Sequence, residues 1–221
     1  MAEQTSQPAA EMDRAAEEAG FYHEAALNAA WTGSRFAIGA LSFLYGAFAF
    51  AYFYLRSVNA SGRWHGSGYH APPIGYGVTI LILVVVSAAI QYLALQRIKA
   101  GAKAAWQAGA LVALVLGVVA VALQIVELLN LPFQPGSSGF SSVFTGFWPV
   151  MLVSWLAAMI WLEILIMRVR PLPAIFFVEQ PPTYAEAFAV QRFQSSLSAF
   201  TLIWNYLALV TVFFFLLFYV F

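Results

Sequence analysis

The chain has 221 residues, of which 62% are hydrophobic and only 9% charged, and its formal net charge is zero. Soluble globular domains carry about 25% charged residues, so this composition excludes an ordinary soluble protein and predicts a chain that lies mostly in lipid. The sequence contains no cysteine, which excludes disulfides, a thiolate nucleophile and cysteine-ligated metal sites.

The N-terminal segment differs from the rest of the chain. Its first 34 residues are polar and rich in Ala and Glu. They lack an apolar core behind a basic start, so they do not resemble a cleavable signal peptide. We therefore expect residues 1–34 to form a polar segment at the cytoplasmic surface or the interface, and the first apolar run to direct membrane insertion.

Five apolar runs follow, each long enough to cross a bilayer as a helix of about 20 residues. They are Phe36–Leu55, Gly75–Leu95, Gln107–Leu129, Val143–Met167 and Ser198–Val220. The sequence therefore predicts an all-α integral membrane protein in which residues 35–221 form a bundle of five transmembrane helices. In the connection between Val169 and Ser195, the short run 174–178 is expected to lie at the interface or against the bundle.

The basic residues predict the orientation, because Lys and Arg accumulate in cytoplasmic loops. One side of the predicted membrane domain holds Arg14, Arg35, Arg97, Lys99, Lys103, Arg168, Arg170 and Arg192, and the other holds Arg56 and Arg63. This asymmetry predicts that the N-terminus lies inside and the C-terminus outside.

The third run has a seam of small residues at four-residue spacing, Ala105, Gly109, Ala113 and Gly117. Small residues allow helix backbones to approach closely in membranes. Continued at helical spacing, the seam reaches Gln124 and Glu127. We therefore expect this polar pair on a packed face rather than toward lipid.

Glu127 and Glu163 are the two carboxylates within the apolar runs, and such acids are functional candidates because they are costly in lipid. Glu127 near the end of its run has a bundle-bracing interpretation, with a proton relay or a lipid contact as the alternative. Glu163, five residues before Arg168, is interpreted as an anchor near the membrane boundary, paired locally or reaching to the interface.

Other polar residues give weaker signals. His65 and His70 share a glycine-containing loop and could bind a metal, although no acid accompanies them there. His23 has a solvated or interfacial interpretation, and Asn205 is expected to form a hydrogen bond with a neighbouring helix. None of the five runs contains a histidine, so bis-histidine haem ligation is excluded within them.

Particular motifs resemble subunit III of the haem-copper cytochrome c and quinol oxidases, in its five-helix form, over about residues 36–221. Ala51-Tyr-Phe-Tyr-Leu-Arg56, which includes Tyr52, is similar to the family's Ala-Tyr-Phe-x-Leu-Arg. Gln124-Ile-Val-Glu127, followed by Leu131-Pro-Phe133, resembles the family's Gln-x-x-Glu and downstream Pro-Phe. Phe140–Phe147 resembles the loop that enters the next helix, and Trp204-Asn-Tyr206 stands where the family usually has Trp-His-Phe.

The chain also departs from the family at several polar positions. The first-helix acid corresponds to an apolar residue near Leu41. Two histidines of the next-to-last helix correspond to Trp148 and Met151, and the His and Asp of the last helix to Asn205 and Ala208. The resemblance therefore implies the family's architecture with a reduced polar signature. It is compatible with a divergent branch, or with a related subunit of another oxidase or of a nitric oxide reductase.

The resemblance implies a non-catalytic subunit with no cofactor of its own, in the cytoplasmic membrane of a bacterium or archaeon. The haems and copper are expected in the partner subunits I and II. Phospholipids are expected in a V-shaped cleft between the first two helices and the rest, and no nucleic acid is expected as a partner. Gln124, Glu127, Arg56, Tyr52, Trp204, Asn205 and Glu163 are the candidates for structural, lipid or interface roles.

Two other function classes stay open from the sequence. A stand-alone small-solute transporter or channel would need Glu127 or Glu163 to face an aqueous cavity. A membrane enzyme would have to use His65 and His70 of the loop.

Overall fold

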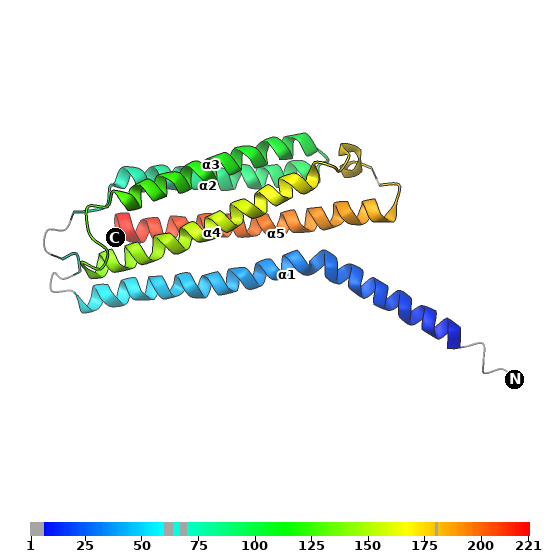
Figure 1. Ribbon diagram of the computed structural model, residues 1–221, viewed down its shortest axis with the longest axis horizontal. Helices are drawn as coiled ribbons and strands as arrows, with labels where there is room; N and C mark the ends of the chain where they lie inside the picture. Colours follow the sequence, from blue (N-terminus) through cyan, green and yellow to red (C-terminus); the bar gives the residue numbers. More distant parts are fainter. Residues whose placement is uncertain (1–6, 60–63, 67–69, 180) are drawn as a thin grey trace.

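The computed structural model describes residues 7–59, 64–66, 70–179 and 181–221, and in the first helix it describes the side chains of residue 14 and of residues 17 onward. The described chain contains five helices that are long and apolar enough to cross a membrane (Figure 1). They are α1 (Gln7–Val58), α2 (Ile74–Lys99), α3 (Lys103–Leu129), α4 (Gly139–Val169) and α5 (Tyr184–Phe215). A 3₁₀ turn, η1 (Ala174–Phe177), precedes α5, and a π-helical turn, η2 (Leu216–Val220), follows it.

Local signals in the sequence set where several of these helices begin. Ser138 and Ser141 form a reciprocal capping box at the start of α4, and Thr183 and Glu186 form another at the start of α5. Between α2 and α3, Gly101 has a φ of +84°, and a Cβ there would lie 2.7 Å from Cγ2 of Val178. A residue other than glycine would therefore strain this turn.

The helices pack so that α5 has neighbours on several sides. α2 packs along α3 and α5, α1 packs along α5 and α4, and α3 also packs against α4. Figure 1 shows the helices lying roughly parallel along the long axis, with α1 along one side of the bundle. The chain ends at the same end of the bundle as the α1–α2 and α3–α4 connections. We call this the C-terminal end, and the opposite one the N-terminal end.

The predicted seam on α3 is confirmed from Gly109 onward. A Cβ added at Gly109 would lie 2.9 Å from Cβ of Ala94 on α2, and one at Gly117 would lie 3.3 Å from the ring of Trp204 on α5. Small residues thus allow α3 to approach α2 closely and leave room for the Trp204 side chain of α5 beside Gly117. Ala105 is exposed and is not part of the seam, because the helix turns Trp106 into the core instead.

Two segments extend beyond the predicted spans. Residues 7–34, which belong to the predicted polar segment, continue into the first span as one helix of 52 residues. At 1.5 Å per residue it is about 78 Å long, more than twice the hydrocarbon thickness of a bilayer. The last helix begins at Tyr184 rather than Ser198, within the predicted connection.

The two extensions pack against each other. Ser195 Oγ donates to the Leu27 carbonyl, and the Tyr184 hydroxyl bonds to the ring of His23. His23, predicted to be solvated or interfacial, is half-buried, and its ring lies 4.7 Å from that of Phe188. The turn η1 packs against α5 and α3, which agrees with the expectation that residues 174–178 lie against the bundle.

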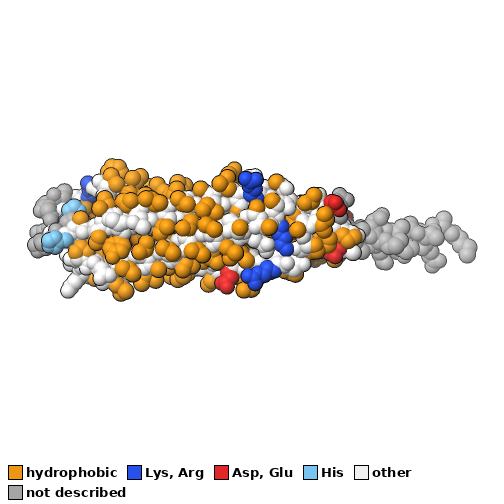
Figure 2. Space-filling view, turned by 90° about the horizontal axis from the view of Figure 1, so that it is seen from above, with side chains coloured by type: hydrophobic (Ala, Val, Ile, Leu, Met, Phe, Trp, Pro, Cys, Tyr) orange, Lys and Arg blue, Asp and Glu red, His pale blue; other side chains and the backbone are white. Residues whose placement is uncertain are grey.

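The surface separates apolar and charged residues along the bundle. Figure 2 shows apolar side chains along most of the body and a band of Lys and Arg near the N-terminal end. The exposed basic residues at the ends of α2 and α4 and near the start of α5 are Arg97, Lys99, Arg168, Arg170 and Arg192. This distribution is typical of a protein whose body lies in lipid and whose charged end lies at the membrane surface.

Candidate functional site

The predicted polar pair of α3 lies inside the bundle near its C-terminal end. Gln124 is 3% exposed and Glu127 is fully buried, as the helical seam predicted. Gln124 Nε2 donates to Glu127 Oε2 over 2.8 Å, and the Tyr219 hydroxyl donates to Glu127 Oε1. The carboxylate therefore connects α3 to η2, the last turn of the chain.

Tyr219 was not predicted as a member of this site. It reaches Glu127 from the π-helical turn, in which the Phe221 amide donates to the Leu216 carbonyl over 3.0 Å. The ring also needs Gly77 of α2, because a Cβ there would lie 2.7 Å from Tyr219 Cζ. In the sequence, Gly77 indicates that some side chain can come close to α2 at this point. It does not indicate that this side chain is Tyr219.

The end of α1 joins the same end of the bundle. Tyr52 is 1% exposed, and its hydroxyl accepts a hydrogen bond from Arg56 Nη1 over 3.1 Å. Its ring lies edge-on to Trp64, at 5.1 Å, and to Phe218 of η2, at 5.9 Å. The turn η2 thus connects the pair Tyr52 and Arg56 of α1 with the pair Gln124 and Glu127 of α3. We call these four residues and Tyr219 the C-terminal cluster.

The loop after α1 is attached to α4 beside this cluster. The Trp64 carbonyl accepts from the Phe140 amide over 3.1 Å, and Trp64 is 7% exposed. The ring of His65 lies 5.6 Å from that of Phe140. Of the other residues of this predicted loop, Arg63 and Tyr69 lie outside the described residues. Residues 64–66 thus pack as part of the bundle end.

A cavity of about 370 Å³ opens beside the C-terminal cluster. Its walls are mostly apolar and include Tyr52, His65, Pro72, Phe218 and Tyr219. Tyr219 lines this cavity and also bonds to Glu127, so its ring lies between the two. The arrangement braces the carboxylate with two donors and does not present it to a substrate.

His65 gives this end of the bundle a pH dependence. The side chain of His65 is exposed, but its partial desolvation and, secondarily, the positive charge of Arg56 lower its pKa from the ordinary value of 6.5. Because folding disfavours the protonated ring, the contribution of the neutral His65 ring to stability is fully present above about pH 6.5 and is lost as the pH falls toward the lowered pKa. We expect amide exchange in residues 64–66 to accelerate over that interval.

Hydrogen exchange measured between pH 7.5 and 5 on the wild type and on His65→Gln tests this expectation. Corrected for the intrinsic exchange rate, the variant is expected to lose the acid-dependent acceleration. An equal acceleration in both proteins would contradict the role of His65.

Trp204, also predicted from the sequence, lies in the middle of the bundle. It is fully buried, and its Nε1 donates to Ser87 Oγ of α2 over 3.2 Å. Ser87 in turn donates to the Ala113 carbonyl of α3 over 2.9 Å. The ring packs edge-on to Trp155 of α4 at 4.9 Å. One side chain therefore contacts α2, α3 and α4 from α5.

Asn205 and Glu163 belong neither to the C-terminal cluster nor to the contacts around Trp204. Asn205 is half-buried, and its amide has no hydrogen-bond partner among the described residues, so the expected bond to a neighbouring helix does not form there. Glu163 is exposed on α4 and, within the same part of the chain, forms no ion pair with Arg168. Five residues turn a helix by about 140° beyond a full turn, so the two side chains diverge.

The structure contains further buried polar atoms that sequence reasoning did not single out. Both amide atoms of Gln91 are buried without a hydrogen-bond partner in the described structure, as are Nε1 of Trp106 and Trp148. Such atoms are costly, so they mark places where packing overrides hydrogen bonding. Within the described ranges, no group of three or more His, Cys, Asp or Glu could hold a metal ion.

Comparison with known proteins adds no relative. No protein-family model matches the chain, and no curated protein sequence matches it.

Proposed function

We propose that this chain is a non-catalytic, subunit III-like component of a respiratory haem-copper oxidase, in a bacterial or archaeal cytoplasmic membrane. One observation carries the proposal. The two motifs that best resemble the family, around Tyr52–Arg56 and Gln124–Glu127, lie at the same end of the bundle and brace it through η2. The polar side chains of these two motifs thus hold helices together.

The proposed orientation places the N-terminus inside. The support is the one-sided distribution of Lys and Arg, which favours retention of the N-terminal end of the bundle on the cytoplasmic side. In this orientation the C-terminal cluster faces the opposite side of the membrane. The haems and copper belong to the partner subunits I and II, and this chain supplies a packing surface to them.

The exposed polar residues of the apolar body support a partner surface. Glu163 is exposed on α4, more than a turn before the basic end of that helix. Asn205 is half-buried on α5 and has a free amide within the described part of the chain. Carboxylates and amides facing lipid are costly, and a neighbouring subunit would relieve that cost.

Lipid holding is proposed for the groove between α1 and α5. The cleft expected from the resemblance separates the first two helices from the rest. Because α2 packs along α3 and α5, we propose the α1–α5 groove as the lipid site instead. The groove has a volume of about 430 Å³ and apolar walls that include Gly46, Ala49 and Leu209. Ser42 and Tyr206 cross it with a hydrogen bond of 2.9 Å. An acyl chain matches these walls in polarity.

We do not propose transport. A transporter would have to expose Glu127 or Glu163 to an aqueous cavity, and Glu127 is fully buried between two donors. Glu163 lies on the outside of α4, between apolar positions such as Ile160 and Ile164 that are also exposed. These placements favour roles in packing and association.

Affinity purification of the tagged full chain from its native membrane, in a mild detergent, tests the proposal. We expect subunits I and II of a haem-copper oxidase to copurify, and Glu163→Leu to reduce their yield relative to a matched Ile164→Leu variant on the same exposed stretch. Isolation of a stable chain without oxidase subunits would contradict the proposal.

A further inference from the structure

The first part of α1 projects beyond the rest of the bundle. Figure 1 shows the dark blue end of α1 continuing past the N-terminal end of the bundle, away from the other described helices. Residues 7–22 cover about 24 Å at the helical rise of 1.5 Å per residue. We call residues 7–24 the N-terminal arm.

The arm is fixed to the bundle at its root. The Tyr184 hydroxyl bonds to the ring of His23, and Ser195 Oγ donates to the Leu27 carbonyl. The face of α1 that carries His23 and Leu27 therefore contacts α5. A helix turns by about 100° per residue, so Phe21 lies about 160° around the helix from His23. The side of the arm at Phe21 thus faces away from α5.

This outward face combines aromatic rings with carboxylates. Phe21 is 70% exposed and Tyr22 is 69% exposed, and their ring centroids lie 5.8 Å apart. Glu17 and Glu18 are exposed one turn earlier, so the four-residue spacing places one acid beside each ring. Glu24 is exposed one turn after Phe21. These three carboxylates have no hydrogen-bond or ion-pair partner among the described residues.

The charge of this part of the sequence has one sign. Six of the chain's ten acidic residues fall within its first 24 residues, and a single Lys or Arg, Arg14, accompanies them. The six are Glu3, Glu11, Asp13, Glu17, Glu18 and Glu24. A surface with an excess of one charge attracts surfaces of the opposite charge. The composition therefore favours a basic partner.

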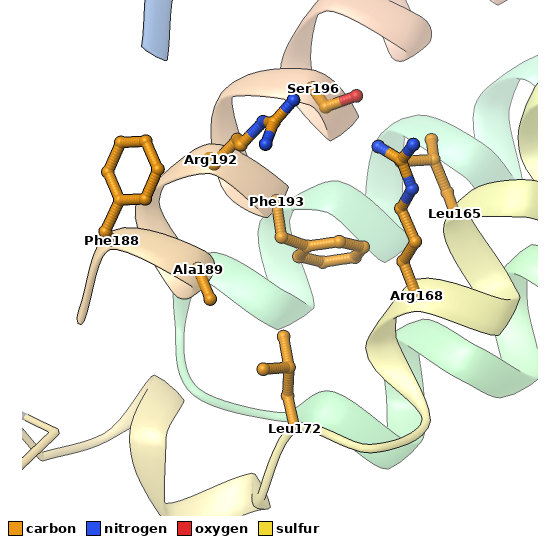
Figure 3. A pocket seen from close by; sticks show the side chains of 8 residues that line it. All are labelled: Leu165, Arg168, Leu172, Phe188, Ala189, Arg192, Phe193 and Ser196. Atoms are coloured by element: carbon orange, nitrogen blue, oxygen red, sulfur yellow. The ribbon is translucent and has the colours of Figure 1, made fainter. Parts of the chain in front are cut away.

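The basic end of the same chain does not neutralise these acids. Arg168 of α4 and Arg192 of α5 line a pocket between these two helices, and Figure 3 shows both directed toward the same space above Phe193. Neither forms an ion pair with a carboxylate among the residues that the structure describes. The carboxylates of the outward face are thus available to another molecule.

The depth of the charges argues against a second copy of this chain as that molecule. Arg192 lies eight residues, about 12 Å, further into the bundle than Tyr184, which contacts His23. Glu17 lies six residues, about 9 Å, further out than His23. A second copy in the same membrane holds its own basic residues at the depth of Arg192. The matching charges must lie further from the membrane.

The membrane surface is also a poor match for the outward face. Helices that lie in the interface carry Lys and Arg on their polar face. The outward face carries Glu17, Glu18 and Glu24 instead, and an anionic leaflet repels carboxylates. Two adjacent aromatic rings that are exposed outside the apolar body are typical of a protein contact, because such rings are enriched in interfaces.

We propose that the outward face of the arm docks a basic surface of a partner protein that extends outside the membrane at the N-terminal end of this chain. Arg is the best match, because its guanidinium group pairs with a carboxylate and also stacks on an aromatic ring. Glu17 and Glu18 supply the carboxylates, and Phe21 and Tyr22 supply the rings. The inference does not rest on the oxidase proposal, because it uses none of the family motifs.

Photo-crosslinking in native membranes tests the docking. The tagged full chain carries the photoreactive amino acid benzoylphenylalanine in place of Tyr22, or, as a control, in place of Ile175, which is 48% exposed in η1. We expect position 22 to crosslink to one partner protein, within a stretch that mass spectrometry identifies as rich in Lys and Arg. Position 175 is expected to give at least about fivefold less of the same product, because η1 lies outside the arm.

Charge reversal tests the chemistry of the contact. With the photoreactive group at position 22, E17K/E18K is expected to lower the crosslink yield at least about fivefold, because two attractions become repulsions. E179K reverses an exposed carboxylate outside the arm and is expected to change the yield less than about twofold. Salt at about 0.5 M is expected to lower the wild-type yield as well, because it screens exposed charges.

A further variant keeps the test independent of folding. E17Q/E18Q removes both charges without reversing them and is expected to give a yield between those of the wild type and E17K/E18K. Equal yields in the wild type and both double variants would overturn the proposal. Crosslinks confined to lipid or to a second copy of this chain would overturn it too, as would a partner stretch without Lys and Arg.

Discussion

Replacement of Glu127 by leucine is expected to lower the free energy of unfolding by about 2–4 kcal/mol, because it leaves two buried donors without an acceptor. These donors are Gln124 Nε2 and the Tyr219 hydroxyl. The loss should appear first at η2, which Glu127 holds against α3. Thermal unfolding in detergent, followed by tryptophan fluorescence, measures the change.

A double-mutant cycle with Tyr219→Phe distinguishes this bond from a general packing effect. Phenylalanine keeps the ring that packs on Gly77 and removes only the hydroxyl. If Glu127 acts through Tyr219, E127L and Y219F together should cost less than the sum of the two single changes, by about 0.5–3 kcal/mol. Strict additivity would contradict the direct coupling. Glu127→Gln, which keeps an acceptor, should cost less than E127L.

In the proposed oxidase, we expect the same E127L change to affect how firmly this chain is held in the complex. Glu127 is fully buried within this chain, so it cannot contact another subunit directly. We expect E127L to weaken retention of this chain or of its lipids, through a loosened C-terminal end, while assembled complexes keep single-turnover electron transfer. An immediate loss of electron transfer in fully assembled complexes would contradict this role.

Replacement of Trp204 by alanine is expected to have the larger effect on the bundle itself, about 3–5 kcal/mol, as is typical for a large buried aromatic side chain. The change removes the contacts of the Trp204 ring with Trp155 and with α3 beside Gly117. It opens a cavity among α2, α3, α4 and α5. The same thermal unfolding measurement applies.

Two variants serve as controls for W204A. Trp204→Phe keeps most of the ring and loses the hydrogen bond to Ser87, so it should cost about 1 kcal/mol from that bond plus a smaller packing loss. Trp161→Ala removes a tryptophan that is only half-buried, although its ring lies 5.6 Å from that of Phe200. A W161A loss equal to that of W204A would contradict the central position of Trp204.

Much of the fold could be predicted because apolar length and composition are local properties of the sequence. All five runs correspond to helices that are apolar enough to cross a membrane. The extensions at residues 7–34 and 184–197 could not be predicted from hydropathy. These stretches are polar or mixed, and contacts such as Ser195 with the Leu27 carbonyl join residues that are distant in sequence.

Part of the candidate site could also be predicted, because the spacing of residues along one helix is a local property of the sequence. Helical spacing alone places Gln124 and Glu127 on the packed face of α3. Tyr219 was missed because its approach depends on a π-helical turn and on a glycine in another helix. Arg168 and Arg192 were counted as charges for orientation, but the sequence did not show that they face one pocket. Glu163 and Arg168 form no ion pair within the described residues, because their side chains diverge, and the expectation that Glu163 reaches to the interface stays a prediction.

The most direct test of the central proposal is the haem spectrum of the native complex that contains this chain. The complex should be isolated through a tag on the full chain, after gentle solubilisation of its own membrane. We predict the reduced-minus-oxidised bands of haem a or haem b from a copurifying subunit I. A chain that is stable alone and brings no oxidase haem with it would contradict the proposal.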